Sequence, residues 1–279
     1  MTLPAPHLLN DGSQLPAIGF GTYPLTGSEG ADAVSSALEI GYRLIDTAVN
    51  YGNEDVVGRA IAASDVPRSE IVVTTKLPGR DHGYDETLRS FEASAEALGL
   101  ETIDLYLIHW PNPSVGKFAE SWKAMVQLQK DHRVRSIGVS NFTEAFLERL
   151  GAETGVLPAV NQIEVHPYFP QDALVEYHRE HGILTEAWSP LGKRAAPYQE
   201  QVIADIANAH GITPTQAVLR WHVQRGIVPL PKSANPERQR SNFEMPGDDL
   251  TVDEIAAITA LGKPDGRLFG GDPNTHEEM

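Results

Sequence analysis

The sequence predicts an α/β protein folded as a (β/α)8 TIM barrel, with an N-terminal β-hairpin before it and a C-terminal helix and tail after it. Eight short apolar runs recur at nearly even spacing along 279 residues. Amphipathic helical patterns lie between these runs, and no change of composition marks a linker. Near-continuous apolar strands are typical of a parallel sheet that is covered on both faces. We therefore expect a single barrel domain over residues 1–279.

The expected strands share an apolar, β-branched character and comprise residues 17–20, 43–46, 71–74, 103–108, 136–139, 159–162, 183–187 and 227–230. Helices are expected over residues 28–40, 85–98 and 143–150, each followed by a glycine, and from Pro214 behind Thr213. Asp11-Gly12 predicts the turn of a hairpin over residues 8–15, which could cover the bottom of the barrel. Residues 251–261 predict a last helix, and a polar, glycine-rich tail follows over residues 262–279.

Composition excludes several classes of function. The formal net charge of -16 disfavours nucleic acid and anionic membranes as partners. The absence of cysteine excludes disulfides, thiolate nucleophiles and cysteine metal ligands. The first residues lack the pattern of a signal peptide, and no apolar window is long enough to span a membrane. We expect a cytoplasmic monomer that acts on a small molecule.

Polar side chains end several of the expected strands, and in a barrel the carboxyl ends of the strands form the active site. Asp46 and Lys76 end the second and third strands, which are neighbours, so the two residues can pair across the sheet. Either residue alone has a structural explanation, but a buried ion pair at a barrel mouth is costly and indicates a function. Tyr51 follows Asp46 on a loop, and His109 ends the fourth strand.

Four long motifs resemble those of the aldo-keto reductases: residues 41–54 (GYRLIDTAVNYGNE), 98–111 (LGLETIDLYLIHWP), 138–142 (GVSNF) and 228–233 (VPLPKS). The resemblance runs in order from Leu8 to Arg267 and covers nearly the whole chain. Within this family the sequence is most similar to the bacterial 2,5-diketo-D-gluconate reductases, because the loops after His109 and Gly192 are short.

The resemblance implies a catalytic tetrad of Asp46, Tyr51, Lys76 and His109. These residue types suit carbonyl reduction, because the alkoxide left by hydride addition needs a proton. Tyr51 would supply that proton, and the Lys76 ammonium would make the phenol a better acid by lowering its pKa. Asp46 would hold Lys76 charged, and His109 would donate a hydrogen bond to the carbonyl oxygen. The hydride itself must come from a cofactor.

No G-x-G-x-x-G motif follows the first expected strand, so a Rossmann site is not indicated. The resemblance instead implies NADPH (or NADP+) extended across the barrel mouth. By this resemblance, the nicotinamide amide would bind Ser140, Asn141 and Gln162, and the nicotinamide ring would stack on Trp188. The pyrophosphate would lie along Ser189 and Leu191, and the 2′-phosphate would contact Lys232, Ser233 and Arg238. The adenine would lie near Asn242, and the remaining residues of the cofactor site would be Leu230, Ala234 and Ser241. Two residues depart from the common pattern, since Trp188 replaces a tyrosine and Ser241 a glutamate. The Ser241 exchange leaves the strength of the preference for NADPH over NADH open.

We expect an NADPH-dependent oxidoreductase that reduces aldehydes, ketones or dicarbonyls, including small substrates similar to 2,5-diketo-gluconate or methylglyoxal. Tyr23, His109 and Trp110 would contact the substrate, together with Trp188, in a pocket that short loops leave open. An NADP(H)-binding sensor or scaffold on the same barrel, with little turnover, is the alternative.

A metal-dependent barrel hydrolase using His109 and Asp46 is a weaker alternative. Clustered ligands such as H-x-H are absent from the sequence, so we expect no metal site. Several other histidines, including His82 and His178, fall in expected loops and helices, and we expect them at the surface.

Overall fold

The fold is built on a parallel sheet of eight strands, described here in a computed structural model that covers residues 5–279. The first four residues, part of the start for which no signal peptide is expected, lie outside the described residues. The strands follow chain order around the sheet: β3 (Phe20–Gly21), β4 (Leu44–Asp46), β5 (Val72–Leu77), β6 (Ile103–Ile108), β7 (Val134–Ser140), β8 (Val160–Glu164), β9 (Leu184–Trp188) and β10 (Ile227–Pro229). Each of the eight expected strands therefore has a counterpart.

Backbone hydrogen bonds between the first and last strands close the sheet into a barrel. The Gly19 amide donates to the Pro229 carbonyl at 3.1 Å, and the Gly21 amide donates to the Pro231 carbonyl at 3.1 Å. A side chain at Gly19 would have its Cβ 2.5 Å from the Leu230 side chain, so only glycine fits this seam. The predicted (β/α)8 barrel is confirmed. The expected first strand was placed too early, because only Phe20 and Gly21 pair with β4.

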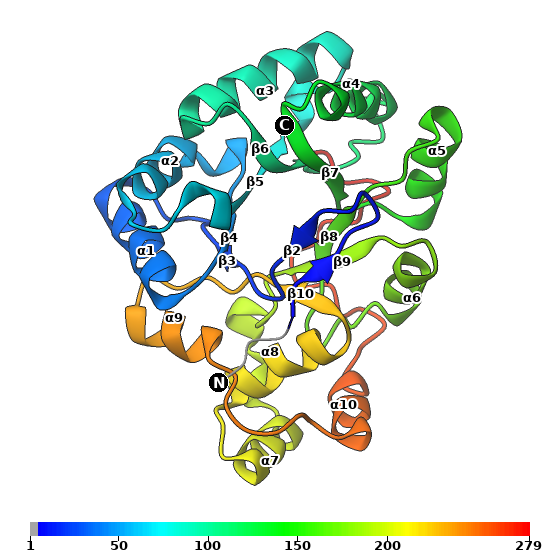
Figure 1. Ribbon diagram of the computed structural model, residues 1–279. Helices are drawn as coiled ribbons and strands as arrows, with labels where there is room; N and C mark the ends of the chain where they lie inside the picture. The colour runs from blue at the N-terminus through cyan, green and yellow to red at the C-terminus, as the bar shows by residue number, and fades with distance from the viewer. Residues whose placement is uncertain (1–4) are drawn as a thin grey trace.

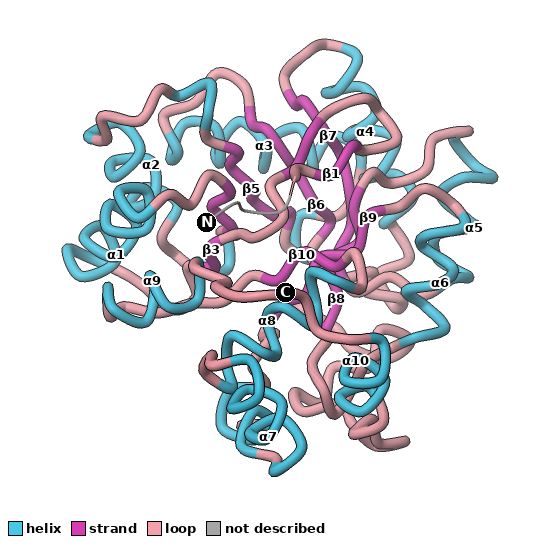
Figure 2. Tube along the Cα trace, turned by 60° about the horizontal axis from the view of Figure 1, so that its bottom comes forward, coloured by secondary structure: helices cyan, strands magenta, loops and turns pink. Residues whose placement is uncertain are grey.

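Helices surround the strands, as Figure 2 shows with the strands in magenta at the centre. They are α1 (Gly27–Ile40), α2 (Glu54–Ala63), α3 (Tyr84–Leu98), α4 (Phe118–Lys130), α5 (Glu144–Thr154), α6 (Asp172–Glu180), α7 (Gln201–His210), α8 (Pro214–Gln224), α9 (Pro236–Phe243) and α10 (Val252–Thr259). Their inner faces and the outer faces of the strands bury a large apolar layer that includes Trp122, Phe91 and Trp221. Between residues 5 and 279, no helix is both long and apolar enough to cross a membrane.

The N-terminal hairpin covers one end of the barrel. β1 (His7–Leu8) pairs with β2 (Gln14–Leu15), and Gly12 in the turn between them has a φ of 86°, as the Asp11-Gly12 motif predicts. Figure 1 shows this hairpin over the centre of the strands. Its Leu15 packs into the apolar cluster that fills the barrel interior. The chemistry must therefore lie at the opposite end, where the strands have their carboxyl ends.

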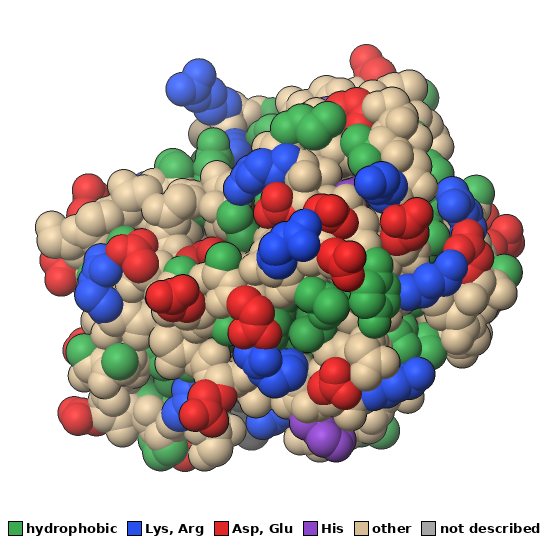
Figure 3. All heavy atoms as spheres, turned by 90° about the horizontal axis from the view of Figure 1, so that it is seen from above, with side chains coloured by type: hydrophobic (Ala, Val, Ile, Leu, Met, Phe, Trp, Pro, Cys, Tyr) green, Lys and Arg blue, Asp and Glu red, His purple; other side chains and the backbone are tan. Residues whose placement is uncertain are grey.

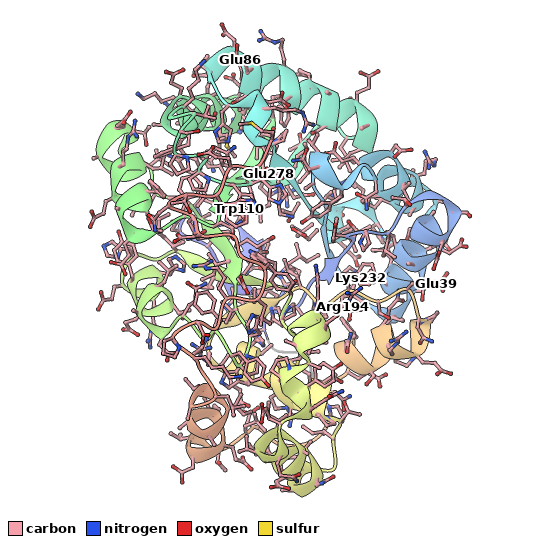
Figure 4. All side chains as sticks on the ribbon, turned by 180° about the vertical axis from the view of Figure 1, so that it is seen from behind. Glu39, Glu86, Trp110, Arg194, Lys232 and Glu278 are labelled. Carbon is pink, nitrogen blue, oxygen red and sulfur yellow. The ribbon has the colours of Figure 1, made fainter. Side chains whose placement is uncertain are left out.

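The C-terminal tail is folded against this opposite end. It follows α10, whose N-terminus is capped by Thr251 in a capping box with Glu254. The Leu268 amide donates to the Glu164 carboxylate at 2.7 Å, and Asn112 donates to the Glu278 carbonyl at 2.5 Å. In Figure 4, which views the molecule from behind, Glu278 lies over the central strands. The polar tail therefore crosses the barrel mouth.

Two histidines expected at the surface are buried, so that prediction was wrong for them. His178 on α6 bonds to Asn161 on β8 and to Thr185 on β9, at 2.9 Å each, and burial lowers its pKa to about 3. His82 is buried near the tail residues Glu277 and Glu278, and burial lowers its pKa to about 4. Both rings are neutral at pH 7, which is the form that apolar surroundings favour.

Candidate active site

An ion pair between Lys76 and Asp46 forms the base of the site. The two residues lie on neighbouring strands, and the Lys76 ammonium donates to an Asp46 carboxylate oxygen at 2.6 Å and to the Thr47 carbonyl at 2.8 Å. The Lys76 side chain is completely buried. The pairing expected from the strand ends is therefore present. Burial disfavours the ammonium, but the charges of Asp46 and Tyr51 outweigh it and raise the pKa of Lys76.

Tyr51 lies above this pair, on the short 3-10 helix η1 (Val49–Tyr51) that follows β4. Its hydroxyl is 3.4 Å from the Lys76 ammonium. Burial raises the pKa of Tyr51 to about 12, although the Lys76 charge lowers it, and the nearby Asp46 and Glu278 carboxylates raise it. The Lys76 charge lowers the pKa of the phenol, as expected, but burial raises that pKa by more. Tyr51 is consequently a protonated hydroxyl at neutral pH.

His109, at the end of β6, lies beside Tyr51, with 5.8 Å between the ring centroids. Asn141 donates to the His109 carbonyl at 3.0 Å and so fixes the backbone at this position. On the other side of the ring, a Glu278 carboxylate oxygen is 2.9 Å from Nδ1 of His109. The four residues expected to form a tetrad are thus neighbours, and the tail adds a carboxylate to them.

A second buried carboxyl, Glu186 on β9, lies beneath the tetrad. The Gln162 amide donates to both Glu186 and Asp46, at 2.9 Å each, and so links the two carboxyl groups. Burial, and then the charge of Asp46, raise the pKa of Glu186 to about 8. At neutral pH Glu186 therefore holds a proton and is uncharged. The buried group then contains one positive charge, on Lys76, and one negative charge, on Asp46.

A cavity of 840 Å³ opens above these groups. Its lining includes the expected catalytic and substrate residues Asp46, Tyr51, His109, Tyr23 and Trp110, together with the expected cofactor residues Ser140, Asn141, Gln162, Trp188, Ser189, Leu191, Leu230, Lys232, Ser233, Arg238, Ser241 and Asn242. Lys76 lies below the cavity floor. Ala234 is exposed and is not among the residues that line the cavity, just before α9 begins, so its part in the cofactor site stays a prediction.

Polar side chains form one wall near Tyr51. The Asn141 amide donates to the Ser140 hydroxyl at 3.0 Å, and the Trp188 indole donates to the Asn141 side-chain oxygen at 2.8 Å. These bonds hold the Trp188 ring at the cavity edge. A flat ring next to amide and hydroxyl groups is a suitable surface for an aromatic carboxamide.

Positive side chains line the cavity from the aromatic rings outward. The Lys193 ammonium lies 5.2 Å from the centroid of the Tyr23 ring and 4.8 Å from that of the Phe269 ring. Lys232 and Arg238 also line the cavity, and Figure 4 places Lys232 away from the centre of the barrel. Burial, and then the nearby Lys232 charge, lower the pKa of Lys193. The positive charges of Lys193 and Lys232 repel each other, and a bound anion would offset this repulsion. α9 also begins here, with the Asn235 side chain accepting a hydrogen bond from the Arg238 amide at 3.0 Å.

The family model that matches the sequence is the Aldo/keto reductase family, over residues 17–263. The chain belongs to the aldo-keto reductase family. A relative from Corynebacterium sp., 2,5-diketo-D-gluconic acid reductase B, is 55% identical over 271 residues, which is 97% of either chain. This agrees with the resemblance seen in the motifs, and it makes the protein an oxidoreductase.

Solved structures of the family superpose closely on this aldo-keto reductase. A crystal structure of Gox0644 with NADPH has a TM-score of 0.93 and 45% identity, and covers 98% of both chains. An aldo-keto reductase from Brucella melitensis has a TM-score of 0.89 and 47% identity, over 93% of this chain and 100% of its own. The barrel is therefore shared along nearly the whole length.

Several residues of the reductase site were missed from the sequence: Lys193, Phe269, Glu186 and Glu278. Lys193 carried a weak signal, because it directly follows Gly192 in the loop after β9. The expectation of an open pocket was wrong where the tail crosses it. His276 packs on Trp110 with 4.2 Å between ring centroids, and only 9% of Trp110 is exposed. In the described part of the chain, no cluster of three or more His, Asp or Glu residues is arranged to hold a metal ion.

Proposed function

We propose that this aldo-keto reductase reduces the carbonyl group of small aldehydes, ketones or dicarbonyls, with Tyr51 as the general acid. One observation carries the proposal: the protonated Tyr51 hydroxyl lies 3.4 Å from the buried Lys76 ammonium and faces the same cavity as His109. A proton donor, a cation to stabilise the anion it leaves, and a hydrogen-bond donor are the groups that carbonyl reduction requires.

The cofactor is NADPH, and the cavity fits it. Amide and hydroxyl groups line one end and positive side chains the other, which matches a molecule with a carboxamide at one end and phosphates at the other. Gly21 lines the middle, where a Cβ would come within 3.1 Å of the Leu230 carbonyl and narrow the cavity. Ser140, Asn141 and Gln162 would hold the carboxamide, Trp188 the ring, and Lys193, Lys232 and Arg238 the phosphates. When bound, NADPH supplies the hydride for the carbonyl carbon.

The residues of the chain supply the proton and the orientation. His109 binds the carbonyl oxygen beside Tyr51, and the Tyr51 hydroxyl passes its proton to that oxygen as negative charge develops on it. Lys76 stabilises the phenolate that remains, and Asp46 keeps Lys76 charged. With a pKa near 12 in the resting protein, Tyr51 retains its proton until this moment.

Aromatic rings line the pocket next to Tyr51. Tyr23 packs on Tyr51 with 5.1 Å between ring centroids, Trp188 packs on Phe269 at 5.2 Å, and Trp110 completes the lining. We propose substrates of the size of methylglyoxal or a hexose-derived dicarbonyl such as 2,5-diketo-gluconate. The Corynebacterium relative is named for reduction of 2,5-diketo-D-gluconic acid.

We further propose that the protein is a single barrel domain over residues 1–279 and acts as a cytoplasmic monomer without nucleic acid or membrane partners. One described cavity joins the tetrad and the cationic cluster, so one chain carries all the groups that the reaction needs. Size-exclusion chromatography with light scattering tests the monomer, and a mass above 30.4 kDa in the absence of aggregation would refute it.

The substitution Tyr51→Phe tests the acid. We expect turnover of methylglyoxal to fall about a thousandfold, because the phenol proton is removed while the ring remains. The dissociation constant of NADPH, measured by calorimetry, should stay within about twofold, since Tyr51 does not touch the cationic end. Undiminished NADPH oxidation in this variant would refute the role of Tyr51. A wild-type protein that binds NADPH but reduces no member of a carbonyl panel would instead support a sensor or scaffold.

A further inference from the structure

The tail places one carboxylate directly on a tetrad residue. Glu278 contacts His109 with 2.9 Å between a carboxylate oxygen and Nδ1, and 11% of the His109 side chain and 17% of the Glu278 side chain remain exposed. Nδ1 is buried and has no directed hydrogen-bond partner among the described residues, so this carboxylate is its close polar neighbour.

The position of Glu278 is fixed by a docking site built from two loops. Asn50 donates to the Glu278 carboxylate at 2.5 Å and to the Met279 carbonyl at 3.1 Å. Asn112 donates to the Glu278 carbonyl at 2.5 Å and accepts from its amide at 3.4 Å. Gly79 lies so close beneath that a Cβ there would come within 1.9 Å of the Glu278 carbonyl. The carboxylate is therefore held at the ring by several contacts besides the ion pair.

Glu278 is ionised at neutral pH. Burial alone would raise the pKa of Glu278, but the interactions with His109 and Asn50 together hold it below its usual value. An ionised oxygen that is itself fixed 2.9 Å from Nδ1 restricts rotation of the imidazole ring. The ring is therefore kept in one orientation toward the cavity that His109 lines.

We propose that Glu278 is a positioning residue that acts through His109: it holds the imidazole ring in the orientation in which His109 binds the substrate carbonyl oxygen. The inference rests on the proposed function, in which His109 binds that oxygen. No proton leaves His109 in this step, because Tyr51 supplies it. A hydrogen-bonding group that is already held in place stabilises the developing alkoxide better than one that must first reorient.

The charged and titratable groups that surround this pair come from four elements: Tyr51 on η1, Arg80 on η3 (Gly79–Asp81) through its bond to Asn50, His82 after η3, and Glu277 on the tail. His82 is neutral, and the Glu277 carboxylate accepts from the Ser114 amide at 2.8 Å, away from the ring. The Glu278 charge also raises the pKa of Tyr51, so the experiment has to separate an effect through His109 from a direct effect on Tyr51.

The substitution Glu278→Gln tests this role. It keeps an oxygen that Asn50 can bind, and it removes the charge. We expect kcat for methylglyoxal to fall about tenfold at pH 7, because the His109 ring is no longer held in one orientation. KM and the NADPH dissociation constant should remain within about twofold. Glu277→Gln is the matched control, since it removes a neighbouring tail carboxylate that does not touch His109.

The same substitution in a His109→Gln background decides how Glu278 acts. If it acts through the ring, kcat of the double variant equals that of His109→Gln alone. A further tenfold loss in that background, or a loss equal to that of Glu277→Gln, would overturn the inference. A Glu278→Gln variant in which only KM changes would overturn the inference as well. These results are separate from the test of the proposed function, because Tyr51→Phe would still abolish turnover in a protein where Glu278 plays no part.

Discussion

At the scale of single residues, the buried Lys76–Asp46 pair is the feature on which both the chemistry and the stability of the site depend. Lys76→Met keeps the length of the side chain and removes its charge. We expect kcat to fall at least about a hundredfold, because the Tyr51 phenolate is no longer stabilised. We also expect the free energy of unfolding to fall by about 3–5 kcal/mol, because Asp46 is left as an unpaired buried carboxylate. Stopped-flow reduction and urea unfolding measure the two effects, and a variant that loses neither would contradict the assigned pairing.

Glu186 gives the protein a pH-dependent stability. Its pKa is raised in the folded state to about 8, and its usual value is 4.5. The folded protein therefore keeps a proton that the unfolded chain releases, so this contribution to stability is complete below pH 4.5 and is lost as the pH rises to 8. The melting temperature of Glu186→Gln should consequently decline less than that of the wild type between pH 5 and pH 8, by at least about 4 °C. Equal slopes, or a change matched by the exposed control Glu101→Gln, would contradict this.

The tetrad could be predicted from the sequence because its members occupy strand ends or the loop just after one, and the barrel brings those positions together. Ala234 follows Lys232 and Ser233 in the same motif, but it is exposed and not part of the cavity lining, so its predicted contact with the cofactor stays a prediction. Glu278 could not be predicted, since its contact with His109 depends on the path of the tail over the mouth, which has no periodic pattern to read. The net rise in the pKa of Tyr51 could not be predicted from the sequence either, because it depends on how deeply the ring is buried.

At the scale of elements, α9 connects helix capping to cofactor binding. Asn235 caps this helix, and Arg238 lies in its first turn. Asn235→Ala should destabilise the protein by about 1 kcal/mol and raise the NADPH dissociation constant about threefold or more, because the first turn loses its anchor. Thr251→Ala is the matched control, since Thr251 caps α10 in the same way but does not line the cavity. If both variants weaken NADPH binding equally, the link between this cap and the cofactor is wrong.

The sequence predicted the ends of some helices closely and of others not. The expected helix over residues 143–150 was ended too early, because α5 continues through Gly151 to Thr154. Glycines that follow α1 and α3 mark helix ends in the sequence and adopt positive φ in the structure. The first strand had no comparable marker. An apolar run predicts that a segment is buried, but which of its residues pair with β4 depends on how the barrel closes.

At the scale of the whole molecule, a strongly acidic protein holds a local cluster of positive charge. The formal net charge is -16, and acidic and basic side chains are mixed on the face shown in Figure 3. Because Lys193, Lys232 and Arg238 line the cavity, salt should weaken NADPH binding. We expect the dissociation constant to rise about fivefold or more between 20 and 500 mM NaCl. NADH lacks the 2′-phosphate and should show a weaker dependence; equal dependence for both would contradict a 2′-phosphate contact with these cations.

The N-terminal hairpin and the C-terminal tail lie on opposite sides of the barrel. The Met279 carbonyl accepts from Asn50, a neighbour of Tyr51 in sequence, and the Met279 side chain is exposed. An affinity tag fused after Met279 would thus start within a few ångströms of the reacting groups and could pull the tail from its seat. A tag on the hairpin side would leave the mouth undisturbed, so purification handles for kinetic work on this enzyme belong at the N-terminus.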